Sequence, residues 1–99
     1  MNTQSKKIGT ELTFFPDARF DSITAPKIQS ELESQLADVT KLILDFTATT
    51  FLSSAGIRVV LWAETQMKNR QGTMIIRNVN DNLKEVFVMT GLDTLLNFE

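Results

Sequence analysis

The sequence predicts an α/β fold: a mixed β-sheet of about four strands covered by α-helices, in the order β-β-α-β-α-β-α. Two observations predict it. Short β-prone or continuously apolar segments alternate with segments in which apolar residues recur every three or four positions, a pattern typical of a partly parallel sheet. The 99 residues, 42% of them hydrophobic and 22% charged, have the size and composition of one soluble domain, which we expect to span residues 1–99.

The N-terminal third predicts a β-hairpin and then a helix. The β-prone segment Glu11–Phe15 follows Gly9-Thr10, a pair that turns the chain back from a shorter strand at Ser5–Ile8. The segment Thr24–Pro26 is typical of a helix start, with threonine as the cap and proline in the first turn. We expect a helix of about twelve residues, whose apolar face carries Ala25, Ile28, Leu32 and Leu36.

The central third predicts a buried strand and a second helix. Lys41–Phe46 is almost continuously apolar, as a strand covered on both faces requires. Ser53-Ser54 then begin a helix that we expect to run to about Arg70 and to end at Gln71-Gly72. The apolar side chains expected to pack in the core here are Phe51, Leu52, Ile57, Val60, Leu61, Trp62 and Met67.

The C-terminal third predicts one more strand and a third helix. Thr73–Val79 is the strand, and Asn80 or Asn82 caps the helix. Gly91 stands where the end of a helix favours glycine, and Leu92–Glu99 adds a short turn or strand. The inward residues of this helix are Leu83, Val86 and Phe87.

The missing residue types exclude most catalytic chemistry. The chain has no cysteine and no histidine, which excludes disulfides, thiolate chemistry, Cys/His zinc sites and every triad with a histidine base. Its four glycines are too widely separated for a P-loop or a dinucleotide-binding motif, and no EF-hand spacing occurs. We therefore expect neither a metal nor a cofactor.

The net charge and the lengths of the apolar runs limit which classes of partner we expect the chain to bind. A net charge of −2 argues against direct nucleic-acid binding, which needs a surplus of lysine and arginine. The longest apolar run, Val59–Ala63, is far shorter than the about 20 residues of a membrane helix. The N-terminal residues also lack the apolar segment of a secretory signal. We expect a cytoplasmic protein that does not insert into membranes.

Three carboxylates are the only candidate catalytic residues that the sequence offers. Asp17 and Asp21 lie near one loop and Asp45 ends a strand. Acid–base chemistry requires such groups to converge in a cleft with shifted pKa values. Asp21 has a simpler role, because aspartate commonly starts the turn before a helix. We therefore expect a binding module rather than an enzyme. The alternative, a small carboxylate-dependent enzyme, would be detected by a turnover assay that compares the wild type with Asp21→Asn.

The segment Thr49–Arg58 is the most informative, because two serines stand at the start of the second helix. Serine is a preferred N-cap, since its hydroxyl accepts a hydrogen bond from a first-turn N–H group. A phosphate on such a serine would face unpaired N–H groups and the positive end of the helix dipole. It would add about −1.5 to −2 charges to a surface of small and apolar groups. This arrangement suits a switch at a partner interface.

Three segments resemble motifs of one protein family, in the same order along the chain. Leu44–Phe46 and Phe51–Ile57 are similar to a Leu-Asp-Leu strand end followed by a Phe-Met-Asp-Ser-Ser-Gly-Leu motif. Arg19–Pro26 resembles an Arg-Leu-Asp-x-x-Thr-Ala-Pro segment, and Val86–Leu92 resembles Leu-Phe-x-x-Ser/Thr-Gly-Leu. The family is that of the STAS domains of anti-sigma factor antagonists (anti-anti-sigma factors), and the resemblance covers essentially the whole chain.

The resemblance implies a phospho-switchable binding protein. Such antagonists bind an anti-sigma factor, often a serine kinase, and so release a sigma factor; the kinase phosphorylates the antagonist, and a serine phosphatase resets it. By motif alignment the acceptor is Ser54, which we also expect to cap the helix. Ser53 replaces the family's aspartate and is the minor alternative. The implied partner-binding edge comprises Asp21, Ser22, Ile23, Thr24, Ser53, Ala55, Gly56 and Arg58.

A second function is compatible with the same resemblance. The chain would then be a STAS subunit with a structural role in a lipid-transport or signalling complex, binding through the same surface without phosphorylation. A neighbouring gene for a kinase-like anti-sigma factor favours the switch, and one for a permease or ATPase favours the structural role. In both cases we expect a monomer or a weak dimer.

Overall fold

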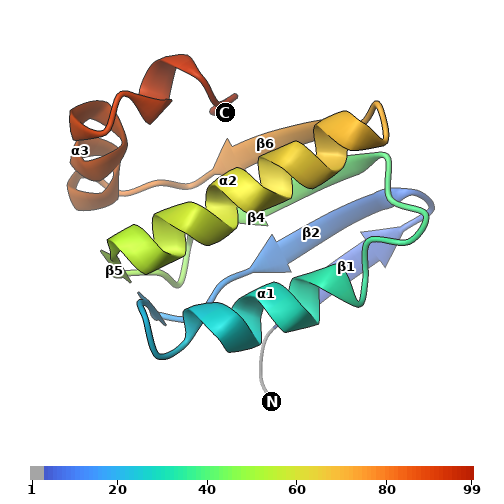
Figure 1. Cartoon of the computed structure of the whole chain (residues 1–99), viewed down its shortest axis with the longest axis horizontal. Coiled ribbons are helices and arrows are strands. Elements are labelled where there is room, and N and C mark those ends of the chain that lie inside the picture. Colours follow the sequence, from blue (N-terminus) through green and yellow to red (C-terminus); the bar gives the residue numbers. More distant parts are fainter. Residues whose placement is uncertain (1–3) are drawn as a thin grey trace.

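Four strands form the main sheet, in the order β1-β2-β4-β6 (Figure 1). The computed structural model describes residues 4–99. β1 (Gln4–Ile8) and β2 (Glu11–Phe15) form the expected antiparallel hairpin, with Gly9 at φ 62° in its turn. β4 (Lys41–Asp45) and β6 (Thr73–Arg77) continue the sheet in the direction of β2. The predicted mixed four-stranded sheet is confirmed.

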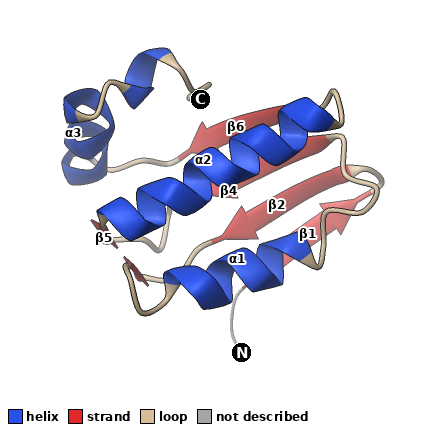
Figure 2. Cartoon of the chain, in the orientation of Figure 1, coloured by secondary structure: helices blue, strands red, loops and turns tan. Residues whose placement is uncertain are grey.

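Helices cover one face of this sheet (Figures 1 and 2). α1 (Ala25–Glu33) and α2 (Ser54–Asn69) lie side by side across it, and α3 (Asp81–Met89) lies beyond the end at which β4 and β6 finish. The shortest extent of the molecule is 19 Å, which fits two layers. No helix within residues 4–99 is long and apolar enough to cross a membrane.

The apolar run of β4 predicted cover on both faces, but among residues 4–99 the helices cover one face only. Leu42 and Leu44 point to the helical side, whereas Ile43 points to the reverse face and is still only 1% exposed. Its register neighbours on the flanking strands are Thr13 and Ile75. A central strand is therefore shielded on its reverse face by its neighbours rather than by a second helical layer.

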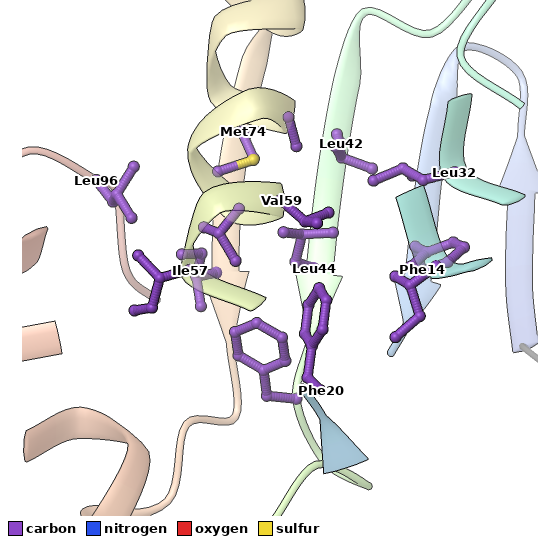
Figure 3. Close-up of a cluster of buried hydrophobic side chains, with 14 of the residues drawn as sticks. Phe14, Phe20, Leu32, Leu42, Leu44, Ile57, Val59, Met74 and Leu96 are labelled. Carbon is purple, nitrogen blue, oxygen red and sulfur yellow. The ribbon is translucent and has the colours of Figure 1, made fainter. Parts of the chain in front are cut away.

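The hydrophobic core fills the space between the sheet and the helices (Figure 3). It joins β2, β4, β6, α1 and α2 through buried side chains that include Phe14, Leu32, Leu42, Leu44, Val59 and Met74. A row of aromatic rings extends it toward α3: the ring centroids of Phe20 and Phe46 are 6.5 Å apart, and those of Phe46 and Phe87 are 6.2 Å apart. This row ties the segment before α1 to the C-terminal part of the chain.

Two helical predictions need correction. α1 ends at Glu33 rather than near Leu36, because the N–H groups of Gln35 and Leu36 bond to carbonyl oxygens three residues back, as in a tighter 3₁₀ turn. Leu36 is nevertheless buried, so its apolar character reflects burial rather than helix. On α2, Leu61 was expected in the core but is 37% exposed, while Met67 is fully buried.

The C-terminal predictions are confirmed except for the end of the strand, since β6 stops at Arg77 rather than Val79 and Asn78 has a left-handed backbone at φ 61°. Asn80 caps α3 by accepting a hydrogen bond from a first-turn N–H group at 2.9 Å, and Gly91 follows the helix at φ 77°. The last residues form a 3₁₀ turn, η1 (Leu92–Thr94), and a one-residue parallel bridge between Ile76 and Phe98. The final segment thus supplies both a turn and a short strand contact.

Candidate functional site

A second, very small sheet positions the start of α2. β3 (Arg19–Phe20) and β5 (Phe51–Leu52) pair in parallel, with Arg19 opposite Phe51 and Phe20 opposite Leu52. The sequence did not predict these strands, because two residues are too few to show a period. They join the segment that leads into α1 to the segment that leads into α2, and so bring two distant parts of the chain to one edge (Figure 1).

Gly56 lets α2 begin close to this small sheet. A Cβ atom at position 56 would lie 2.6 Å from the carbonyl oxygen of Phe20 and 2.7 Å from Cδ1 of Leu52. Both distances are far below ordinary contact, so the first turn of α2 fits here because residue 56 has no side chain. The Ser53 N–H donates to the same Phe20 carbonyl at 2.9 Å and fixes the approach.

Ser53, not Ser54, caps α2. Ser53 has an extended backbone (φ −95°, ψ 176°), and its Oγ accepts hydrogen bonds from the N–H groups of Ala55 at 3.2 Å and Gly56 at 3.4 Å. The prediction that Ser54 caps the helix is wrong, and two of the N–H groups expected to face a phosphate are already used. Ser54 is the first helical residue, and its exposed hydroxyl has no hydrogen bond within residues 4–99.

The loop before α1 is organised by Asp21. Its Oδ1 accepts from the N–H groups of Ile23 at 3.0 Å and Thr24 at 3.1 Å, and its Oδ2 accepts from Nε of Arg19 at 3.3 Å. These contacts, the Thr24 N–H foremost, lower the pKa of Asp21. Thr24 makes no side-chain cap; its hydroxyl instead donates to the Arg19 carbonyl oxygen at 2.6 Å. The prediction that Thr24 caps α1 is therefore wrong, and no side chain of the described residues caps this helix.

Two apolar side chains are exposed beside this loop. Ile23 is 84% exposed and Phe51 is 42% exposed. The Arg19 guanidinium lies 4.5 Å from the centre of the Phe51 ring, a cation–π contact. Phe51 was expected in the core, but side chains alternate along a strand, so Leu52 is buried and Phe51 points outward. Because β5 is only two residues long, the sequence carries no signal for this orientation of Phe51. Arg19 begins the motif Arg19–Pro26 but was not among the predicted partner-binding residues.

The other predicted partner-binding residues meet at a groove between α1 and α2. Ser22, Ala55 and Arg58 line this groove together with residues of α1. Arg58 is exposed, and no hydrogen bond or ion pair within residues 4–99 involves it. Gly56, in contrast, is buried beneath the surface. The structure therefore places the loop before α1 and the first turn of α2 at one edge. The lack of a side chain at Gly56 lets these two segments lie close together.

The carboxylates that a small enzyme would need are engaged separately. Asp17 accepts a hydrogen bond from Nζ of Lys27 at 3.0 Å. Asp45 is 6% exposed and accepts from the N–H of Thr47 at 2.9 Å and from Nδ2 of Asn78 at 3.1 Å. Burial raises the pKa of Asp45, but these hydrogen bonds outweigh it and hold the pKa below its usual value. Within residues 4–99 no acidic cluster can hold a metal ion.

Sequence comparison identifies relatives across the whole chain. A sequence model of the STAS domain matches residues 2–99. The anti-sigma-B factor antagonist of Listeria monocytogenes is 28% identical over 86 residues, covering 86% of this chain and 75% of that protein. The anti-sigma-B factor antagonist of Listeria innocua matches with the same identity and coverage.

Solved structures share the fold. The anti-sigma factor antagonist SpoIIAA in its unphosphorylated form matches with a TM-score of 0.83 at 19% identity, covering 99% of this chain and 88% of that chain. The Bacillus cell fate determinant SpoIIAA in the phosphorylated form matches with a TM-score of 0.76 at 19% identity, covering 99% and 91%. Identities this low support the fold, whereas the sequence model supports the family. The protein belongs to the STAS domain family.

Proposed function

We propose that this protein is an anti-sigma factor antagonist, which binds an anti-sigma factor with serine kinase activity and so releases a sigma factor. The relatives from two Listeria species carry the name anti-sigma-B factor antagonist, and SpoIIAA, whose fold this chain shares, is an anti-sigma factor antagonist. The protein is then a regulatory binding protein rather than an enzyme. It acts in the cytoplasm, as a monomer or weak dimer, on the proteins that control transcription.

The exposed hydroxyl of Ser54 is the structural observation that most directly supports the proposal. Its hydroxyl is exposed at the first residue of α2 and has no internal hydrogen bond in the described chain, because Ser53 does the capping. Ala55 follows it and offers little steric bulk, so a kinase active site can approach the backbone at Ser54. Ser53 is the poorer acceptor, since its Oγ already accepts from two N–H groups and its side chain is half-buried.

The docking surface that we propose surrounds Ser54. Ile23 and Phe51 supply its apolar part, and exposed apolar groups beside polar ones are typical of protein-binding sites. The Asp21 turn fixes the backbone at Ile23, and the Arg19 contact holds the Phe51 ring, before a partner arrives. This order reduces the entropy lost on binding. The polar residues of the surface are Asp21, Ser22, Thr24, Ser53 and Arg58, and Ala55 adds a small apolar group.

Phosphorylation of Ser54 then ends the interaction through charge. A phosphate brings about −1.5 to −2 charges to the centre of a surface that binds by covering apolar groups. Removing such a dianion from water at an apolar interface is unfavourable, so the complex dissociates. A separate serine phosphatase removes the phosphate and restores binding.

Phosphorylation in vitro tests the acceptor. The chain is incubated with ATP and the kinase-like anti-sigma factor that it retains from cell extract, and the product is measured by intact-mass spectrometry. We expect one phosphate on the wild type and none on Ser54→Ala. Ser53→Ala is the matched control, because it removes the neighbouring hydroxyl and should still accept one phosphate. Equal modification of Ser54→Ala and wild type would refute the assignment.

Partner binding is tested with Ser54→Asp. We expect the wild-type chain to retain an anti-sigma factor from cell extract, identified by mass, and Ser54→Asp to bind it at least about tenfold more weakly by calorimetry. Thermal unfolding should show that both chains are equally folded. Unchanged affinity, or capture of a transporter subunit by both chains, would instead support a structural role without phosphorylation.

A further inference from the structure

A phosphate on Ser54 would find few hydrogen-bond donors on the backbone of α2. The N–H groups of Ala55 and Gly56 donate to Oγ of Ser53, and that of Ile57 donates to the Ser53 carbonyl oxygen at 2.9 Å. In the first turn of α2, as described, only the Ser54 N–H remains without a partner. A phosphate dianion has three strong acceptor oxygens, so a side chain must supply further donors.

Arg58 is the cation placed to do this. It follows Ser54 by four residues in α2, so the two side chains share one helix face with their Cβ atoms about 5–6 Å apart. Helical side chains lean toward the N-terminus, which directs the Arg58 side chain back toward Ser54. The Arg58 guanidinium is exposed and makes no hydrogen bond or ion pair within residues 4–99. It is therefore available without breaking any existing contact.

Arg19, the other cation near the site, is already engaged. Its Nε donates to the carboxylate of Asp21 at 3.3 Å, and its guanidinium lies over the ring of Phe51 at 4.5 Å. Turning toward a phosphate would break both contacts. The first turn of α2 contains no acidic residue that would compete for Arg58. Glu33 of α1 lines the same groove as Arg58, but within residues 4–99 it makes no ion pair with it. The local charges thus favour Arg58 over Arg19 as the phosphate's partner.

We propose that Arg58 binds the phosphate of phosphorylated Ser54 within the same chain. This inference rests on the proposed function, because it takes Ser54 as the acceptor, and it gives phosphorylation a second effect. In the unmodified protein, Arg58 lines the groove between α1 and α2 and can pair with a carboxylate of the anti-sigma factor. After phosphorylation it is held internally by charge-assisted hydrogen bonds. The modification therefore adds negative charge to the docking surface and also withdraws a positive charge from it.

The second pKa of the phosphate measures this pairing. Phosphoserine is installed at position 54 during translation in otherwise wild-type, Arg58→Gln and Lys68→Gln chains, and each is titrated by phosphorus NMR at low ionic strength. This pKa is about 6 in a free phosphoserine, and we expect it to be lower with Arg58 present than in Arg58→Gln by about 0.3 pH unit or more. Lys68→Gln is the matched control, because it removes one positive charge from α2 about 21 Å away along the helix.

An equal phosphate pKa with and without Arg58 overturns the proposal. An equal rise in Arg58→Gln and Lys68→Gln also overturns it, because the effect would then reflect net charge alone. The result does not depend on the proposed function, since the phosphoserine is introduced without a kinase. If the anti-sigma kinase leaves Ser54 unmodified, the proposed function fails while a pKa difference specific to Arg58→Gln still stands.

Discussion

Replacing Gly56 with alanine tests how tightly the start of α2 is fitted against β3. The new Cβ would lie 2.6 Å from the Phe20 carbonyl oxygen and 2.7 Å from Cδ1 of Leu52, where ordinary contacts are 3.4–4 Å. Leu52 can change its rotamer. The Phe20 carbonyl cannot move freely, because it belongs to β3 and accepts the Ser53 N–H at 2.9 Å. The first turn of α2 must therefore shift away from the small sheet.

The expected loss of stability follows from two opposing effects. Inserting a methyl group into a closely packed contact destabilises a protein by about 1–3 kcal/mol. Alanine is also a better helix former than glycine by about 1 kcal/mol, which offsets part of this. Because the new Cβ meets a backbone oxygen that cannot easily move, we expect a cost in the upper part of that range. After the helix-propensity gain is subtracted, Gly56→Ala should lower the free energy of unfolding by about 1–2 kcal/mol. In a domain of this size each kcal/mol lowers Tm by about 4–8 °C.

Urea unfolding followed by circular dichroism measures this loss. Ser54→Ala is the control, because it changes an exposed residue two positions away and should stay within about 0.5 kcal/mol of wild type. We also expect slower phosphorylation of Gly56→Ala under conditions where it is folded, since the shift separates Ser54 from the loop before α1. A Gly56→Ala chain as stable as the Ser54→Ala control would refute the view that this contact requires glycine.

Three further predictions use the same unfolding assay. Ser53→Ala removes the cap of α2 and should destabilise the protein by about 0.5–2 kcal/mol; no loss would mean that the cap contributes little. Asp45 has a lowered folded-state pKa, so its contribution is present above about pH 4 and is lost as the pH falls through that lowered pKa. Asp45→Asn should therefore differ most from wild type near neutral pH, and a difference independent of pH would contradict this. Phe51→Ala should cost less than about 1 kcal/mol of stability but weaken partner binding measured by calorimetry about tenfold, whereas buried Phe46→Ala should cost about 3–5 kcal/mol.

Most elements could be predicted because each carries a pattern within a few residues. The apolar run of β4, the three- and four-residue spacing of α2, Asn80 before α3 and Gly91 after it are all local signals. The same signals mislead where a residue is buried but does not belong to, or is not covered by, the helix that its pattern suggests. Leu36 continues the apolar period of α1 but is buried from the turn beyond it, and Ile43 is buried without a helix above it. Periodicity reports which side chains are buried, and only indirectly what buries them.

The sequence by itself determined the order of the main-sheet strands and the three helices, the N-terminal hairpin and the serine pair at the start of α2, because these depend on residue types within one turn or one strand. The tertiary structure alone decided that Ser53 caps while Ser54 stays exposed, and that Phe51 faces outward. Both results follow from the pairing of β3 with β5, which holds Ser53 extended against the Phe20 carbonyl. Contacts between segments so far apart in the chain leave no period in a single sequence, so they arise only when the core brings those segments together.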